Sequence, residues 1–85
     1  FSLKQNYPNP FNPTTTFGFT LPSESIVKIS IYNLIGQKVA EVVNSKFASG
    51  NHSVDFNATN LASGIYLYKI EAGNFTSVKK MQLMK

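Results

Sequence analysis

The fold is decided by the stretch Thr14-Thr15-Thr16-Phe17-Gly18-Phe19-Thr20-Leu21, which alternates apolar and polar residues from Phe17 onward. Successive side chains of a β-strand point to opposite sides, so Phe17, Phe19 and Leu21 fall on one face of an extended chain. Pro22-Ser23 then ends the segment. The stretch therefore predicts a β-strand with one buried face.

The same period of two recurs along the rest of the chain, and turn-forming residues separate the segments. No segment has the apolar period of about 3.6 residues that an amphipathic helix requires. Segment 65–71 is apolar on both faces, which predicts a central strand. The predicted strands cover residues 14–21, 26–32, 37–43, 51–56, 65–71 and 75–84, with a short edge strand within residues 1–5.

The predicted connections carry their own signals. Residues 33–36 form a turn in which Gly36 supplies a positive φ, and residues 72–74 form a second hairpin turn. Residues 44–50 are expected to form a loop anchored by Phe47. The longer connection 57–64 ends at Gly64, and its Leu61 is expected to point inward.

This pattern predicts an all-β protein, a small antiparallel Ig-like β-sandwich of about seven strands. The chain has no cysteine or tryptophan, so the likeness to immunoglobulin domains is one of architecture only. With 85 residues it is expected to form a single domain. We divide it into an extended Asn/Pro strap, residues 1–13, and a sandwich body, residues 14–85.

The strap is defined by prolines that alternate with asparagines in Gln5-Asn6-Tyr7-Pro8-Asn9-Pro10-Phe11-Asn12-Pro13. Each proline fixes its own φ and lacks an N–H, and each disfavours helical geometry in the residue before it. The segment can be neither a helix nor a central strand. We expect a stiff, extended strap whose anchors are Tyr7 and Phe11.

Composition limits the function. The net charge is +4, but the chain has no arginine and its lysines are scattered, which argues against a nucleic-acid reader. No apolar run is long enough to span a membrane as a helix, and residues 1–5 lack the features of a signal peptide. A chain that begins at Phe1 without methionine is expected to be a fragment of a longer protein.

The residues do not suggest catalysis. His52 is the only histidine, and the four acidic residues fall on different predicted elements. One histidine without cysteine cannot supply a zinc site, and no phosphate-binding loop occurs, so we expect no enzyme activity, metal or cofactor. We expect His52 to be half-buried and capped by a backbone carbonyl. The Asn-x-Ser/Thr sequences at Asn51, Asn57 and Asn74 are expected to be turn residues.

Four motifs carry a resemblance to a known family. They are the strap with its Asn6-Tyr7-Pro8-Asn9-Pro10-Phe11, the hairpin Ile31-Tyr32-Asn33-Leu34-Ile35-Gly36-Gln37-Lys38-Val39, the segment Ser63-Gly64-Ile65-Tyr66-Leu67-Tyr68-Lys69 and the terminal Lys80-Met81-Gln82-Leu83-Met84-Lys85. In this order and spacing the chain resembles the type A C-terminal sorting domain of the type IX, or Por, secretion system of Bacteroidetes-type bacteria. The likeness covers essentially the whole chain.

This resemblance implies a β-sandwich that serves as a non-catalytic secretion signal for a cargo protein attached at its N-terminus. It implies recognition by the outer-membrane translocon and its shuttle components, transit through the periplasm, and a final location at the cell surface or outside the cell. A surface sortase would then remove the domain as its substrate. It also implies that the C-terminal residues matter for export, and we assign partner recognition to Lys80, Met81, Leu83 and Lys85.

Two other functions remain open from the sequence. The chain could be a carbohydrate-binding or structural sandwich appended to a secreted enzyme, with a platform built from Tyr7, Phe11, Tyr32, Tyr66 and Tyr68. The basic pI of about 9.5 motivates a nucleic-acid binder, although the missing arginine counts against it.

Overall fold

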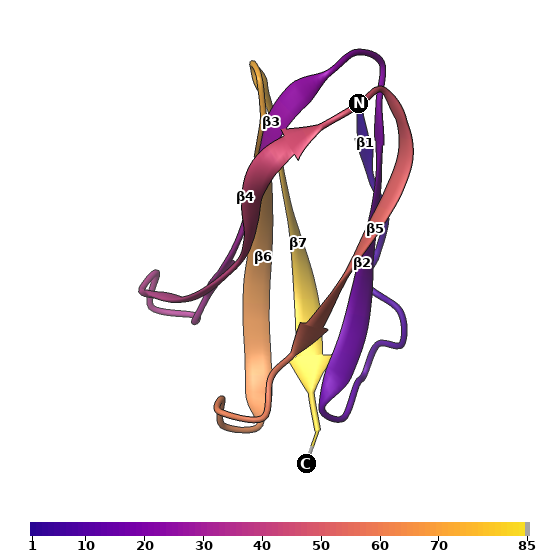
Figure 1. The fold of residues 1–85 in the computed structure, drawn as a ribbon. Helices are drawn as coiled ribbons and strands as arrows, with labels where there is room; N and C mark the ends of the chain where they lie inside the picture. Colours follow the sequence, from indigo (N-terminus) through magenta and orange to yellow (C-terminus); the bar gives the residue numbers. More distant parts are fainter. Residues whose placement is uncertain (85) are drawn as a thin grey trace.

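The computed structural model describes residues 1–84, and these form a two-layer β-sandwich (Figure 1). The described residues contain no helix. The all-β antiparallel sandwich predicted from the alternation is therefore confirmed. Its strands are β1 (Ser2–Leu3), β2 (Thr14–Leu21), β3 (Ser25–Tyr32), β4 (Lys38–Phe47), β5 (Gly50–Asn57), β6 (Gly64–Ala72) and β7 (Phe75–Leu83).

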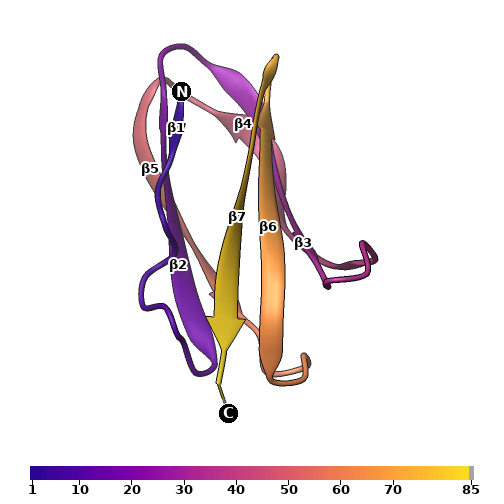
Figure 2. The ribbon, with the colours of Figure 1, turned by 180° about the vertical axis from the view of Figure 1, so that it is seen from behind.

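The strands form two antiparallel sheets. One sheet has the order β1-β2-β5 and the other the order β4-β3-β6-β7. Strand β6 lies between β3 and β7, as its two apolar faces predicted. From behind, the terminal strand β7 runs between β6 of its own sheet and β2 of the other (Figure 2).

Inward-facing side chains from both sheets form one core, in the alternation that the sequence predicted. Every second residue of β2, β3 and β6 is buried, because the side chains of a strand alternate between the core and the outer face. The largest buried apolar side chains are Phe11, Phe17, Phe19, Ile29, Ile31, Tyr68, Ile70, Met81 and Leu83.

The predicted loop 44–50 is wrong, since β4 continues to Phe47 and only residues 48–49 separate it from β5. Residues 44–46 are polar and exposed, which resembles a loop in the sequence, but they pair in turn with Lys28, Val27 and Ile26 of β3. Backbone hydrogen bonds to a neighbouring strand do not depend on side-chain polarity, so an edge strand can look like a loop.

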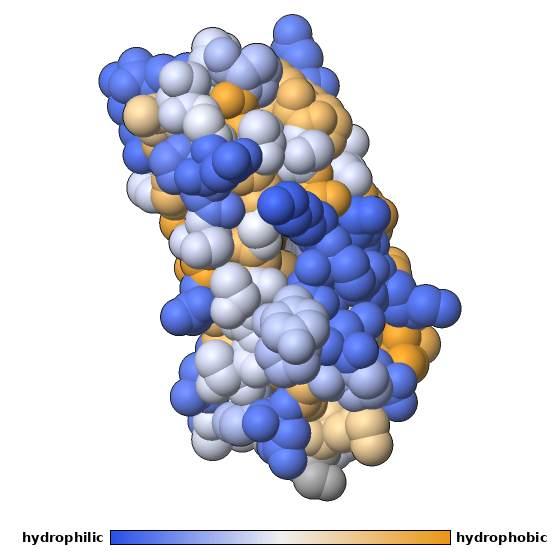
Figure 3. Space-filling model, turned by 90° about the vertical axis from the view of Figure 1, so that its right-hand side faces the viewer, coloured by the Kyte–Doolittle hydropathy of each residue, from blue (hydrophilic) through white to orange (hydrophobic). Residues whose placement is uncertain are grey.

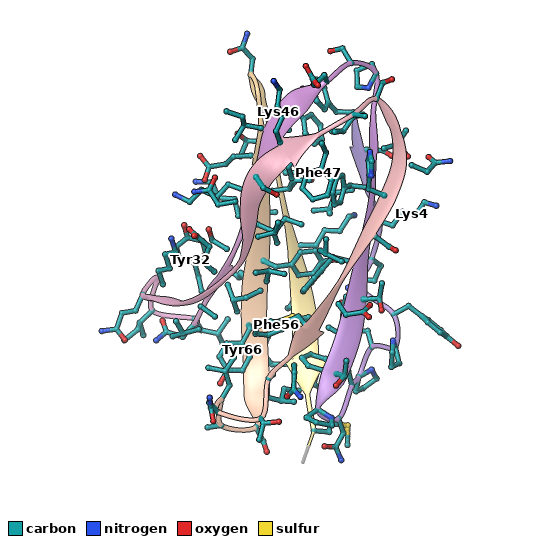
Figure 4. All side chains as sticks on the ribbon, viewed as in Figure 1. Lys4, Tyr32, Lys46, Phe47, Phe56 and Tyr66 are labelled. Carbon is teal, nitrogen blue, oxygen red and sulfur yellow. The ribbon has the colours of Figure 1, made fainter. Side chains whose placement is uncertain are left out.

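Aromatic side chains fill the space between the sheets near β4 and β5. Figure 4 shows Phe47 and Phe56 pointing into this space, whereas Tyr32 lies beside the β3–β4 hairpin. Phe47 packs edge to face on Phe19 with ring centroids 5.2 Å apart. Phe47 therefore has the anchoring role that was predicted for it, although it anchors the end of strand β4 and not a loop.

Candidate functional site

The strap lies along the open edge of β2. The Lys4 N–H donates to the Gly18 carbonyl at 2.9 Å, and Tyr7 and Thr16 exchange two backbone hydrogen bonds of 3.0 Å. The strap is not straight, because the chain bends at residues 8–10 and 12–13. The strap contains no helical residue, and these bends interrupt the extended course that its prolines predicted.

The same strap also covers the edge of β7, which belongs to the other sheet. The Phe11 N–H donates to the Gln82 carbonyl at 3.0 Å, and the Met84 N–H donates to the Phe11 carbonyl at 2.9 Å. The Asn9 side-chain oxygen accepts from the Gln82 N–H at 2.9 Å. The strap therefore joins the two sheets and satisfies backbone groups that an edge strand would otherwise leave open.

One of the two predicted anchors is wrong. Phe11 is buried in the core, but the Tyr7 side chain is 81% exposed and only its backbone is bound. The second anchor is Asn6, which is buried and donates to the Thr15 hydroxyl at 3.0 Å and to the Pro8 carbonyl at 3.1 Å. A buried amide is stable only where its hydrogen-bonding groups have partners, and Thr15 and Pro8 supply them here.

Tyr68 connects the strap to the middle of the core. Its hydroxyl accepts from the Asn6 N–H at 2.8 Å and donates to the Lys4 carbonyl at 3.0 Å. Burial raises the pKa of Tyr68 above its ordinary value, while the hydrogen bond from Asn6 acts in the opposite direction. The side chain is therefore neutral and available as both donor and acceptor at any physiological pH.

The residues assigned to partner recognition occupy different environments. Lys80 is exposed, but Met81 and Leu83 point into the core, and Lys85 lies outside the described residues. The Lys80 carbonyl accepts from the Gln5 side chain at 2.8 Å. The backbone edge of β7 from Lys80 to Met84 is therefore bound by the strap and is not open to strand addition.

The β3–β4 hairpin is a second distinctive surface, which the sequence identified as a turn and a family motif but not as a contact surface. Its tip, defined here as residues 33–37, projects sideways from the sandwich in both ribbon views (Figures 1 and 2). Leu34 is 64% exposed and Ile35 is 81% exposed. The sequence signal was available, since two large aliphatic residues precede Gly36 in a turn where polar residues are usual.

Hydrogen bonds hold the tip in one conformation. The Asn33 side-chain oxygen accepts from the N–H groups of Ile35 at 3.1 Å and Gln37 at 2.9 Å. The Asn33 side-chain amide donates to the Gln37 side chain at 2.8 Å, and the two backbones also bond at 2.9 Å. Gly36 has a φ of 88°, which confirms its predicted role.

Two irregularities in the strand pairing bend the hairpin near its tip. The β3–β4 register shifts between Ile29 and Ser30 and again between Ile31 and Tyr32. An extra residue on one strand bends that strand and increases its twist. The bends give a physical reason for the tip to leave the plane of the sheet.

The predicted aromatic platform does not form. Phe11, Tyr66 and Tyr68 are buried, Tyr32 is half-buried, and only the Tyr7 side chain is widely exposed. The side of the sandwich seen in Figure 3 is mostly hydrophilic, and its apolar residues appear in small separate areas.

The described part of the chain holds little reactive chemistry. His52 is half-buried and its Nε2 lies 2.7 Å from the Ala48 carbonyl, as expected. Residues 1–84 contain no group of three or more potential metal ligands and no pocket. Over the same residues, no helix has the length and apolar character needed to cross a membrane.

A comparison with known protein families shows which family contains this chain. Residues 5–84 match the model of the secretion system C-terminal sorting domain. The chain belongs to this family. A search of curated proteins gave no match.

Membership accounts for several features together. The sorting domain is a signal of the type IX secretion system, addresses an attached cargo to the cell surface or the outside, and interacts with the secretion system. Domains of this family are in general non-catalytic. The match begins at Gln5 and ends at Met84, so it includes both the strap and the strand that the strap covers.

Proposed function

We propose that this sorting domain directs its cargo from the periplasm across the outer membrane as a folded address, and that a surface sortase then removes it. The cargo would be joined N-terminal to Phe1, and the translocon with its shuttle components would bind the folded surface. One observation supports recognition of the domain as a folded structure. The strap and the C-terminal strand are bonded to each other, so neither is presented as a flexible tail.

The predicted recognition residues divide into two roles in this proposal. Lys80 is exposed and would contact the partner directly. Met81 and Leu83 are buried, so they would act by holding β7 in place rather than by contact. Lys85 keeps its predicted role as a charged terminal contact.

The test is export of a fluorescent reporter with an N-terminal signal peptide, fused ahead of residues 1–85 in a host that has the secretion system. Deletion of residues 80–85 would also remove the core residues Met81 and Leu83. A loss of export could then result either from a missing recognition surface or from an unfolded domain. The sharper variant is Lys80→Ser, with Lys46→Ser as the matched exposed control on β4.

Wild-type reporter outside the cell supports the sorting function. Retention of the wild-type fusion in the periplasm, with the domain shown to be folded by protease resistance, contradicts it. Loss of export in Lys80→Ser but not in Lys46→Ser supports direct recognition at β7. Equal export of both variants would remove Lys80 from the recognition surface.

The carbohydrate-binding alternative has no support from this structure, because the five aromatic residues that motivated it do not share an exposed face. Binding of the isolated domain to insoluble polysaccharide would be its direct test.

A further inference from the structure

We propose that the tip of the β3–β4 hairpin, residues 33–37, inserts into an apolar cavity of a protein component of the export machinery. The inference rests on the proposed function and names a contact surface for it. It starts from Leu34 and Ile35, two large aliphatic side chains that are mostly exposed at the end of a projecting hairpin.

The shape of the tip fits insertion into a cavity. It is a single turn, and the bends near the end of β3 and β4 carry it away from both sheets. A convex apolar knob buries most of its surface only inside a concave partner site, whereas a flat partner would cover little of it.

The tip is also rigid before binding. Five hydrogen bonds within residues 33–37 fix the backbone, and three of them use the Asn33 side chain. Ordering a loop upon binding opposes association, so a turn that is already ordered binds more tightly for the same contact area. Turn residues that served only to connect two strands would not need large apolar side chains at these positions.

The charges around the tip favour a protein cavity over an anionic lipid surface. Between residues 33 and 41 the only charged residues are Lys38 and Glu41, and their side chains form an ion pair of 2.9 Å. On the neighbouring strand β6, the residue paired with Tyr32 is the apolar Leu67. Binding to anionic membranes usually combines apolar residues with unpaired lysine or arginine, whereas the one lysine within residues 33–41 is paired with Glu41.

A second copy of the chain is a poor occupant on electrostatic grounds. Each copy carries a net charge of +4, so two copies repel at low ionic strength.

The first test uses the export assay with the double variant Leu34→Ser and Ile35→Ser. Its matched control is Ile26→Ser with Val78→Ser, which removes two aliphatic side chains of similar exposure, 65% and 52%, from the body of the sandwich. Thermal unfolding of residues 1–85 checks that both variants fold. If the double tip variant does not fold, the single variant Ile35→Asn replaces it, because that side chain is mostly exposed.

We expect export of the tip variant to fall about tenfold or more, since two aliphatic side chains lose their burial in the partner, while the control stays within about twofold of wild type. Export of the folded tip variant at the level of the control would overturn the inference and leave the sorting function intact. Failure of the wild-type fusion itself would instead contradict the sorting function.

A second measurement distinguishes a protein cavity from a lipid surface or a second copy of the chain as the binding partner of the tip. The wild-type domain is mixed with vesicles of phosphatidylcholine alone or with added phosphatidylglycerol, and its self-association is followed by sedimentation. Absence of vesicle binding and a monomer support a protein cavity. Vesicle binding or dimerisation that the tip substitutions abolish would assign the tip to lipid or to a second copy and overturn the proposal.

Discussion

Removal of one oxygen atom from the core should loosen the strap. In Tyr68→Phe the ring stays in place, but the hydroxyl that bonds Asn6 and Lys4 is lost. Because Asn6 is buried, its N–H would lose its partner without access to water, at a cost of about 1–3 kcal/mol. Loss of the bond to the exposed Lys4 residue adds about 1 kcal/mol, since water can replace it in part.

The expected loss in the free energy of unfolding is therefore about 3 kcal/mol, a large share of the stability of a small domain. For a domain of this size the midpoint of thermal unfolding falls by about 4–8 °C per kcal/mol, which gives a decrease of about 12–24 °C. Urea unfolding followed by circular dichroism gives the free energy, and thermal unfolding gives the midpoint.

The matched control is Tyr66→Phe, which removes a hydroxyl that makes a single bond of 2.6 Å to the Ala62 carbonyl. We expect it to cost only about 1 kcal/mol. Hydrogen exchange adds a local readout, because the Asn6 amide should lose protection in Tyr68→Phe before the amides of β3 do. Equal losses in the two variants, or an unchanged Asn6 amide, would refute the assignment of Tyr68 as the link between core and strap.

Three further predictions concern the same framework. Phe11→Ala should cost about 3–5 kcal/mol and leave the domain largely unfolded by circular dichroism, because Phe11 is buried; a folded variant would show that this anchor is dispensable. Burial raises the pKa of Tyr68, so the folded state keeps its proton after the unfolded chain loses it near pH 10. Stability should therefore decline as pH rises above about 10, and the difference between wild type and Tyr68→Phe in urea unfolding should shrink there; a constant difference from pH 8 to 11 would contradict this. Gly36→Ala should cost about 1 kcal/mol in urea unfolding through backbone strain alone, since φ is 88° and no neighbouring atom lies within 4 Å of an added Cβ; an unchanged urea midpoint would argue against that strain.

The strands were predictable because their signal is local. In β2 and β6 the alternation of apolar residues follows from the geometry of a single extended chain, and it needs no knowledge of the partner strand. The end of β4 was not predictable in this way, because exposed polar residues 44–46 are held only by backbone bonds to β3.

The candidate surfaces were predictable only in part. The strap and the terminal residues stood out by composition and by resemblance to the family, but their mutual contact did not. The hairpin motif was also visible, yet its exposure depends on the bends in β3 and β4 that carry the tip away from the sandwich.

The sequence by itself determined the all-β class and the turns at glycine, since periodicity and residue type are properties of the chain. Only the tertiary structure decided that Asn6 rather than Tyr7 anchors the strap, and that the strap covers the edge of the last strand. The reason is distance along the chain. The bond from Asn6 to Tyr68 spans 62 residues and the bond from Gln82 to Asn9 spans 73, so no local pattern encodes either.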